Sequence, residues 1–202
     1  MNLPNKLTLS RIALTFIFLV FLFSKGLLFR YLSLVTFIVA SLTDFYDGHI
    51  ARSRNLVTDF GKLMDPIADK ILVLAAFLAF VELQIIPAWM VVLVIVREFV
   101  ITGMRLLAAS KGIVLPADKS GKHKTASQMI AIFSILSYLA IKDTMRFLQD
   151  TRGFVQFHGS GIEGFFDFAI VILMIVTVSF TLSSGIFYLW SNKDIVLGAK
   201  TD

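Results

Sequence analysis

The sequence predicts an all-α integral membrane protein: six transmembrane helices preceded by a short amino-terminal interfacial segment. Hydrophobic residues make up 57% of the 202 residues and the mean hydropathy is +0.82, which leaves too few polar side chains to cover a water-soluble surface. Apolar stretches of about the length that a bilayer core requires follow one another along the chain. We expect a single membrane domain over residues 1–202. Disulfides are excluded because the sequence contains no cysteine.

The first half of the chain is expected to begin at the membrane surface. Residues 1–10 mix apolar and polar side chains and are too few to span a bilayer, so they are predicted to lie at the interface. The first span is predicted over residues 9–23. The second is predicted over residues 28–52, which is longer than a bilayer core needs, so its last turns should protrude into the polar interface.

The remaining four helices are predicted from apolar stretches and from their boundaries. Thr58 or Asp59 can cap the third helix, which should run to about residue 81 with Pro66 inside it. The other three are predicted over residues 87–109, 125–141 and 165–190, with a polar loop over 110–124 and a hydrophilic connection over 142–164.

Basic residues predict the orientation. The side with both termini carries ten lysines and arginines and the opposite side carries five, which favours termini in the cytoplasm. We therefore expect a multi-pass protein of the cytoplasmic membrane, and the net charge of +5 then requires no nucleic-acid partner. The ten are Lys6, Arg11, Arg52, Arg54, Lys111, Lys119, Lys122, Lys124, Lys193 and Lys200, and the five are Lys25, Arg30, Lys142, Arg146 and Arg152.

Four aspartates and their neighbours fall on two narrow helical stripes, where the second span ends and the third begins. The first stripe covers an arc of about 140° and the second repeats every fourth residue. The first consists of Asp44, Asp47, Gly48, Ala51 and Arg52, and the second of Gly61, Asp65 and Asp69. Two facing helices would pool four carboxylates, which repel one another unless hard divalent cations lie between them. The sequence thus predicts a polar, metal-containing cavity at the cytoplasmic face.

These residues suggest a chemistry on phosphates. Two cations about 4 Å apart would clamp a pyrophosphate, and a carboxylate beside them would take the proton of an attacking hydroxyl. We assign that proton to Asp69, although a role as a metal ligand alone fits it equally well. Gly48 and Gly61 would let a nucleotide approach the helices closely, or serve helix packing. Arg52 can hold phosphate oxygens with both ends of its guanidinium group.

The pattern D-x-x-D-G-x-x-A-R followed by G-x-x-x-D-x-x-x-D resembles the signature of the CDP-alcohol phosphotransferase family and departs from it at no fixed position. The resemblance implies a homodimer of six-helix subunits that transfers a phosphatidyl-type group from a CDP-linked lipid to an alcohol and releases CMP. It also implies which residues act. Two divalent cations, Mg²⁺ or Mn²⁺, would be held by Asp44, Asp47, Asp65 and Asp69, and the CDP site would be lined by Gly48, Ala51, Arg52 and Gly61.

The alcohol is indicated by other residues. The segment 3–11 and the stretch from Arg97 to Thr125 are similar to the phosphatidylglycerophosphate synthase branch of the family, whose substrates are CDP-diacylglycerol and sn-glycerol 3-phosphate. An acceptor with a phosphate group needs a basic pocket, although lysines beside a membrane also obey the positive-inside rule. The expected phosphate ligands are Arg105, Lys122 and Lys124, and residues that could edge the pocket are Asn5, Thr8 and Arg11.

Other readings of the sequence stay open. A cardiolipin synthase of the same fold would use phosphatidylglycerol as its acceptor, and a scaffold protein could keep the motif without turnover. A cation transporter would also carry carboxylates within the membrane, but it should have polar residues that reach both faces of the membrane, and the fifth and sixth spans carry almost no polar residues of interest. The pairs Arg97 with Glu98 and Lys70 with Asp69 could be buried ion pairs that only fix helix packing.

Overall fold

The structure is a computed structural model of the whole chain. It describes residues 3–54, 59–110, 120–152 and 160–193, and the side chains of residues 9–43, 70–110, 123–148 and 164–193. The described residues form six α-helices and no strand, which confirms the predicted all-α class. The helices are α1 (Leu3–Phe23), α2 (Leu27–Arg54), α3 (Asp59–Glu82), α4 (Ala88–Ser110), α5 (Ser120–Arg152) and α6 (Ser160–Ser191).

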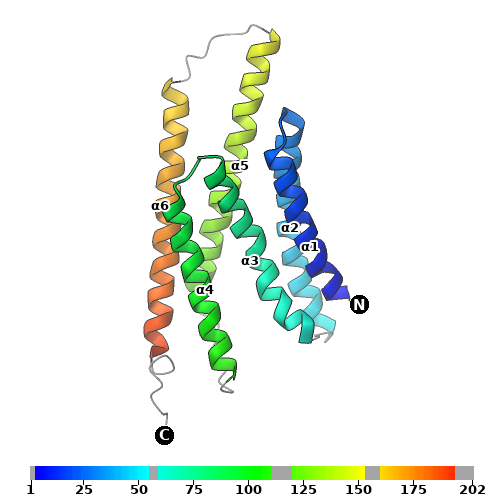
Figure 1. Cartoon of the computed structure of the whole chain (residues 1–202), viewed down its shortest axis with the longest axis vertical. Helices are drawn as coiled ribbons and strands as arrows, with labels where there is room; N and C mark the ends of the chain where they lie inside the picture. The colour runs from blue at the N-terminus through cyan, green and yellow to red at the C-terminus, as the bar shows by residue number, and fades with distance from the viewer. Residues whose placement is uncertain (1–2, 55–58, 111–119, 153–159, 194–202) are drawn as a thin grey trace.

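The helices alternate in direction along the chain (Figure 1). The start of α1, the end of α2, the start of α3, the end of α4 and the end of α6 therefore all lie at one end of the bundle. Within the bundle, α1 packs on α2 and α3, α6 packs on α4 and α5, and α2 packs on α5. The last turns of α2 and the first turns of α3, where the aspartates were predicted to meet, are thus neighbours at that same end.

Large aromatic side chains hold the middle of the bundle together. Phe37 of α2 is fully buried between Phe18 of α1 and Phe133 of α5, with ring centroids 5.5 Å and 5.4 Å away. Phe77 and Phe80 of α3 are also fully buried in this cluster. Aromatic pairs of this kind add to the stabilisation that burial provides, so α1, α2, α3 and α5 share one apolar core.

The outward faces of the helices are apolar as well. Phe16, Leu28, Phe165 and Trp190 are between 63% and 75% exposed, and many other large apolar side chains are exposed beside them. Water-soluble monomers rarely expose apolar surface on this scale. Among the described residues, the helical stretches His123–Leu148 and Gly164–Ser191 are long and apolar enough to cross a membrane, by length and composition. The fold therefore favours a membrane protein.

The helix α1 is continuous from Leu3, so the predicted amino-terminal segment leads into the first span without a break, and its place at the membrane interface stays a prediction. Two predicted connections are too long. The polar loop over residues 110–124 is shorter than predicted, since α5 begins at Ser120. The connection over 142–164 is also shorter, because α5 continues to Arg152 and α6 begins at Ser160.

Polar side chains that find partners explain why α5 continues. Arg30 Nε of α2 donates to Asp143 Oδ2 over 2.7 Å, and the Arg30 guanidinium also donates to the Leu22 carbonyl over 2.8 Å. At the next residue of α5, the Thr144 hydroxyl pairs with the Tyr31 hydroxyl of α2 over 2.8 Å. A polar sequence predicts a loop when its side chains need water, but here neighbouring helices satisfy them.

Candidate active site

The two predicted stripes lie in continuous helix. The turns of α2 and α3 that carry them are helical throughout, Pro66 included, so their spacing places each stripe on one helix face. The side chains of these residues lie outside the described part of the chain, and their metal-binding and nucleotide-binding roles stay predictions. They are Asp44, Asp47, Gly48, Ala51, Arg52, Gly61, Asp65 and Asp69.

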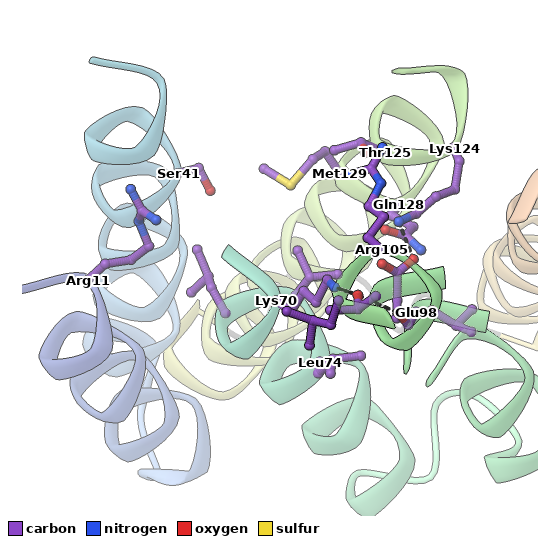
Figure 2. A pocket seen from close by; sticks show the side chains of 15 residues that line it. Arg11, Ser41, Lys70, Leu74, Glu98, Arg105, Lys124, Thr125, Gln128 and Met129 are labelled. Carbon is purple, nitrogen blue, oxygen red and sulfur yellow. Dashed lines mark hydrogen bonds and ion pairs between the residues drawn. The ribbon is translucent and has the colours of Figure 1, made fainter. Parts of the chain in front are cut away.

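A cavity of about 550 Å³ adjoins these turns. Its lining includes Ser41, which precedes Asp44 by three residues, and Lys70, which directly follows Asp69. Less than one helical turn therefore separates the cavity lining from the aspartates on each helix. Figure 2 shows that α1 and α2 form one side of the cavity and α3, α4 and α5 the other.

The lining is strongly basic. Arg11 of α1, Lys70 of α3, Arg105 of α4 and Lys124 of α5 reach the cavity, whereas Glu98 is the one carboxylate among its described lining residues. Arg11 and Lys124 are buried, at 3% and 7% exposed. Positive charges gathered around a cavity attract anions, and guanidinium and ammonium groups can bind the oxygens of a phosphate monoester by charge-assisted hydrogen bonds.

Glu98 connects three helices around the cavity. Its carboxylate accepts a hydrogen bond from Arg97 over 3.2 Å and forms an ion pair with Lys124 of α5. Its backbone carbonyl accepts the hydroxyl of Thr102 over 2.7 Å, and that hydroxyl in turn accepts from Lys70 of α3. The predicted pair of Arg97 and Glu98 is therefore present, but it belongs to a larger network that fixes where the cavity's lysines lie.

The structure brings part of the predicted acceptor site together. Arg105 and Lys124 line the same cavity, and Arg11, one of the predicted edge residues, faces them from α1 (Figure 2). Asn5, Thr8 and Lys122 are on α1 and the first turn of α5, and their side chains lie outside the described residues.

The sequence reasoning missed Gln128. This residue lines the cavity, is 3% exposed, and its side-chain Nε2 has no hydrogen-bond partner among the described residues. A buried amide without a partner is unfavourable, so Nε2 is suited to donate to a ligand. The sequence contains a pattern that indicates this residue: Gln128 follows Lys124 by one helical turn, on the same face of a predominantly apolar helix.

The sixth span was predicted to carry almost no polar residues of interest, and this is wrong. Arg97 donates from Nη2 to Ser184 of α6 over 2.9 Å. Arg105 donates from Nε to the Tyr188 hydroxyl over 3.2 Å, and its guanidinium carbon lies 5.5 Å from the centre of the Tyr188 ring. Between these two contacts, Gly185 lies so close to Arg97 that a Cβ atom there would be 2.8 Å from Arg97 Cγ.

The four aspartates remain the candidate metal ligands. Among the side chains that the structure describes, no group of three or more histidines and carboxylates is placed to hold a metal ion. A donor set of four carboxylates, with oxygen atoms only, suits Mg²⁺ or Mn²⁺. The chemistry of the donor set therefore fits the divalent cations that the resemblance implies.

Comparison with known proteins agrees with the signature. The sequence profile of the CDP-alcohol phosphatidyltransferase family matches residues 1–191. The chain is 46% identical over 147 residues to a CDP-diacylglycerol–glycerol-3-phosphate 3-phosphatidyltransferase of Bacillus subtilis (strain 168), covering 67% of this chain and 76% of the relative. Proteins of the same name from Rickettsia bellii (strain RML369-C) and Mycoplasma pneumoniae (strain ATCC 29342 / M129 / Subtype 1) are 40% and 35% identical. These matches cover 65% of this chain, and 72% and 66% of the relatives.

Proposed function

Because the chain belongs to the CDP-alcohol phosphatidyltransferase family, we propose that it transfers the phosphatidyl group of CDP-diacylglycerol to sn-glycerol 3-phosphate and releases CMP. The names of the similar proteins support these two substrates. The structural observation that carries the proposal is the basic cavity beside the aspartate-bearing turns. Of its described lining residues, four are cationic and one is a carboxylate.

The charge of the cavity favours this acceptor over a neutral alcohol. The phosphate of sn-glycerol 3-phosphate would lie against Arg105 and Lys124, with Lys122 as a third ligand, as charge-assisted hydrogen bonds favour. Gln128 would add an amide donor from the same face of α5. Glycerol, inositol or serine carries no phosphate, and would make no such charge-assisted contacts with Arg105 and Lys124.

The reaction needs one new bond and one broken bond. The acceptor hydroxyl oxygen bonds to the phosphorus of the phosphatidyl group, the bond from that phosphorus to the CMP oxygen breaks, and the hydroxyl proton passes to Asp69. Arg52 and the backbone at Gly48 and Gly61 hold the nucleotide. Divalent cations on the four aspartates would neutralise the pyrophosphate and polarise the attacked phosphorus.

Release of CMP with a panel of acceptors tests the proposal. We expect purified protein with CDP-diacylglycerol and a divalent cation to release CMP when sn-glycerol 3-phosphate is added. Glycerol is the matched control, because it keeps the hydroxyls and lacks the phosphate, and it should give little release. Equal or faster release with phosphatidylglycerol would instead identify a cardiolipin synthase, and release with glycerol alone would remove the role proposed for the cavity.

We also propose six transmembrane spans with the site on the cytoplasmic side of the cell membrane, in a homodimer as the resemblance implies. Exposed apolar side chains on the outer faces of the bundle support contact with lipid. The basic residues counted above favour cytoplasmic termini.

Single cysteines should report this orientation, because the chain has no cysteine of its own. Lys25 is exposed in the turn between α1 and α2, and Lys193 is exposed just after α6, at the opposite end of the bundle. A membrane-impermeant thiol reagent should label Lys25→Cys in intact cells, and should label Lys193→Cys only after the cells are permeabilised. The reverse pattern would place the site on the outer side of the membrane.

A further inference from the structure

The helix α6 carries a buried polar stripe that the proposed reaction does not use. Thr177, Thr181, Ser184 and Tyr188 are each at most 4% exposed, and their spacing of four, three and four residues places them on one face of the helix. Thr177 contacts α5, since its hydroxyl lies 3.4 Å from the Ser127 carbonyl oxygen. The stripe therefore faces the bundle although α6 supplies none of the described residues that line the cavity.

The cavity end of this stripe contacts both arginines of α4. Ser184 accepts a hydrogen bond from Arg97, which in turn donates to Glu98 of the cavity. Tyr188 contacts Arg105 directly, and Arg105 lines the cavity. The stripe therefore lies behind the basic lining, one residue away from the space that a ligand would fill.

Two contacts with Tyr188 fix the direction of the Arg105 side chain. Arg105 Nε donates a hydrogen bond to the Tyr188 hydroxyl over 3.2 Å. The guanidinium carbon also lies 5.5 Å from the centre of the Tyr188 ring, where a cation is attracted to the ring. Arg105 is itself an exposed residue, and an exposed arginine without such contacts would sample many rotamers. The Nε contact does not involve the two terminal nitrogens, which can bind two oxygens of one phosphate.

We propose that Tyr188 is a positioning residue for the acceptor alcohol, and that it acts through Arg105. It orders the guanidinium before the acceptor's phosphate arrives, so that binding does not have to immobilise this side chain. The inference rests on the proposed function, because it takes Arg105 to be a ligand of the acceptor's phosphate. It adds a residue on the sixth helix, 83 positions away in the sequence, to the determinants of acceptor affinity.

Tyr188→Phe tests the proposal because it removes the hydroxyl and keeps the ring. We expect the KM for sn-glycerol 3-phosphate to rise about 3- to 10-fold, with kcat and the KM for CDP-diacylglycerol little changed. Tyr31→Phe is the matched control: the Tyr31 hydroxyl pairs with Thr144 over 2.8 Å at the other end of the bundle, so its loss should leave both Michaelis constants unchanged.

A double-mutant cycle separates positioning from general packing. If Tyr188 acts through Arg105, then Tyr188→Phe added to Arg105→Ala should raise the acceptor KM no further than Arg105→Ala alone. Fully additive effects, or a Tyr188→Phe protein with the parental acceptor KM, would overturn the inference. Failure of the proposed function has a different result: Arg105→Ala itself would then leave the acceptor KM unchanged.

Discussion

Asp44→Asn and Asp65→Asn should each reduce CMP release by more than about 100-fold, because each removes a ligand charge from the predicted metal site. Asparagine keeps the size of the side chain and one oxygen donor but removes a negative charge. A hard divalent cation depends on that charge, because carboxylate oxygen atoms are its preferred protein ligands. The measurement is CMP release from CDP-diacylglycerol and sn-glycerol 3-phosphate by equal amounts of purified, membrane-inserted protein.

Asp143→Asn provides the matched control for these variants. It makes the same chemical change on α5, where Asp143 pairs with Arg30 far from the cavity, so transfer should continue at close to the parental rate. A chelator should likewise abolish the activity of the unsubstituted protein, and added Mg²⁺ or Mn²⁺ should restore it. Full activity in the chelator, or parental turnover by either aspartate variant, would contradict a metal site on these four residues.

Arg105→Ala should strongly weaken binding of the acceptor, because it removes a charge-assisted contact with the acceptor's phosphate. A hydrogen bond to a charged group contributes roughly 1.5–3 kcal/mol, which corresponds to a loss of about 10- to 150-fold. The loss should affect kcat/KM for sn-glycerol 3-phosphate, while the KM for CDP-diacylglycerol changes little. Arg52→Ala should show the opposite pattern, because Arg52 is predicted to hold the nucleotide.

Both Michaelis constants must therefore be measured for both variants. Arg146→Ala serves as the control, since Arg146 is exposed near the other end of α5 and should leave both constants unchanged. If Arg105→Ala and Arg52→Ala raise the same constant, the cavity does not separate the two substrates as proposed. If Arg105→Ala has no effect, the basic residues at this end of the bundle reflect membrane orientation alone.

The sequence predicted the helices well and their ends less well. Apolar stretches of about the right length are a strong local signal, and the third helix does begin at Asp59, as one of its two predicted caps requires. The ends of α5 were misplaced at both sides because the hydrophilic stretches 110–124 and 142–164, which include Lys124 and Asp143, suggested solvent-exposed loops. Both residues are instead paired with other helices, Lys124 with Glu98 and Asp143 with Arg30, and such partners are invisible to a local pattern.

The lining of the cavity was predictable only in part. The requirement for a basic pocket indicated Arg105 and Lys124, which do line one cavity, whereas the aspartate cluster indicated by two stripes at helical spacing stays a prediction. Nothing local connects Arg105 with Tyr188, because they are far apart in the sequence. Ser184 was missed because a serine in an apolar helix can satisfy its hydroxyl within its own helix, as Ser183 does on the Phe180 carbonyl.

The contact of Gly185 with Arg97 limits which amino acids can occupy that position. Even an alanine would bring its Cβ to 2.8 Å from Arg97 Cγ, close to the stem of the arginine, so the side chain or a helix would have to move. The neighbouring Ile186 and Phe187 are about 60% exposed, and apolar replacements there should be tolerated. Tolerance to mutation along this helix should therefore rise and fall with the helical repeat, although its composition alone suggests an interchangeable membrane anchor.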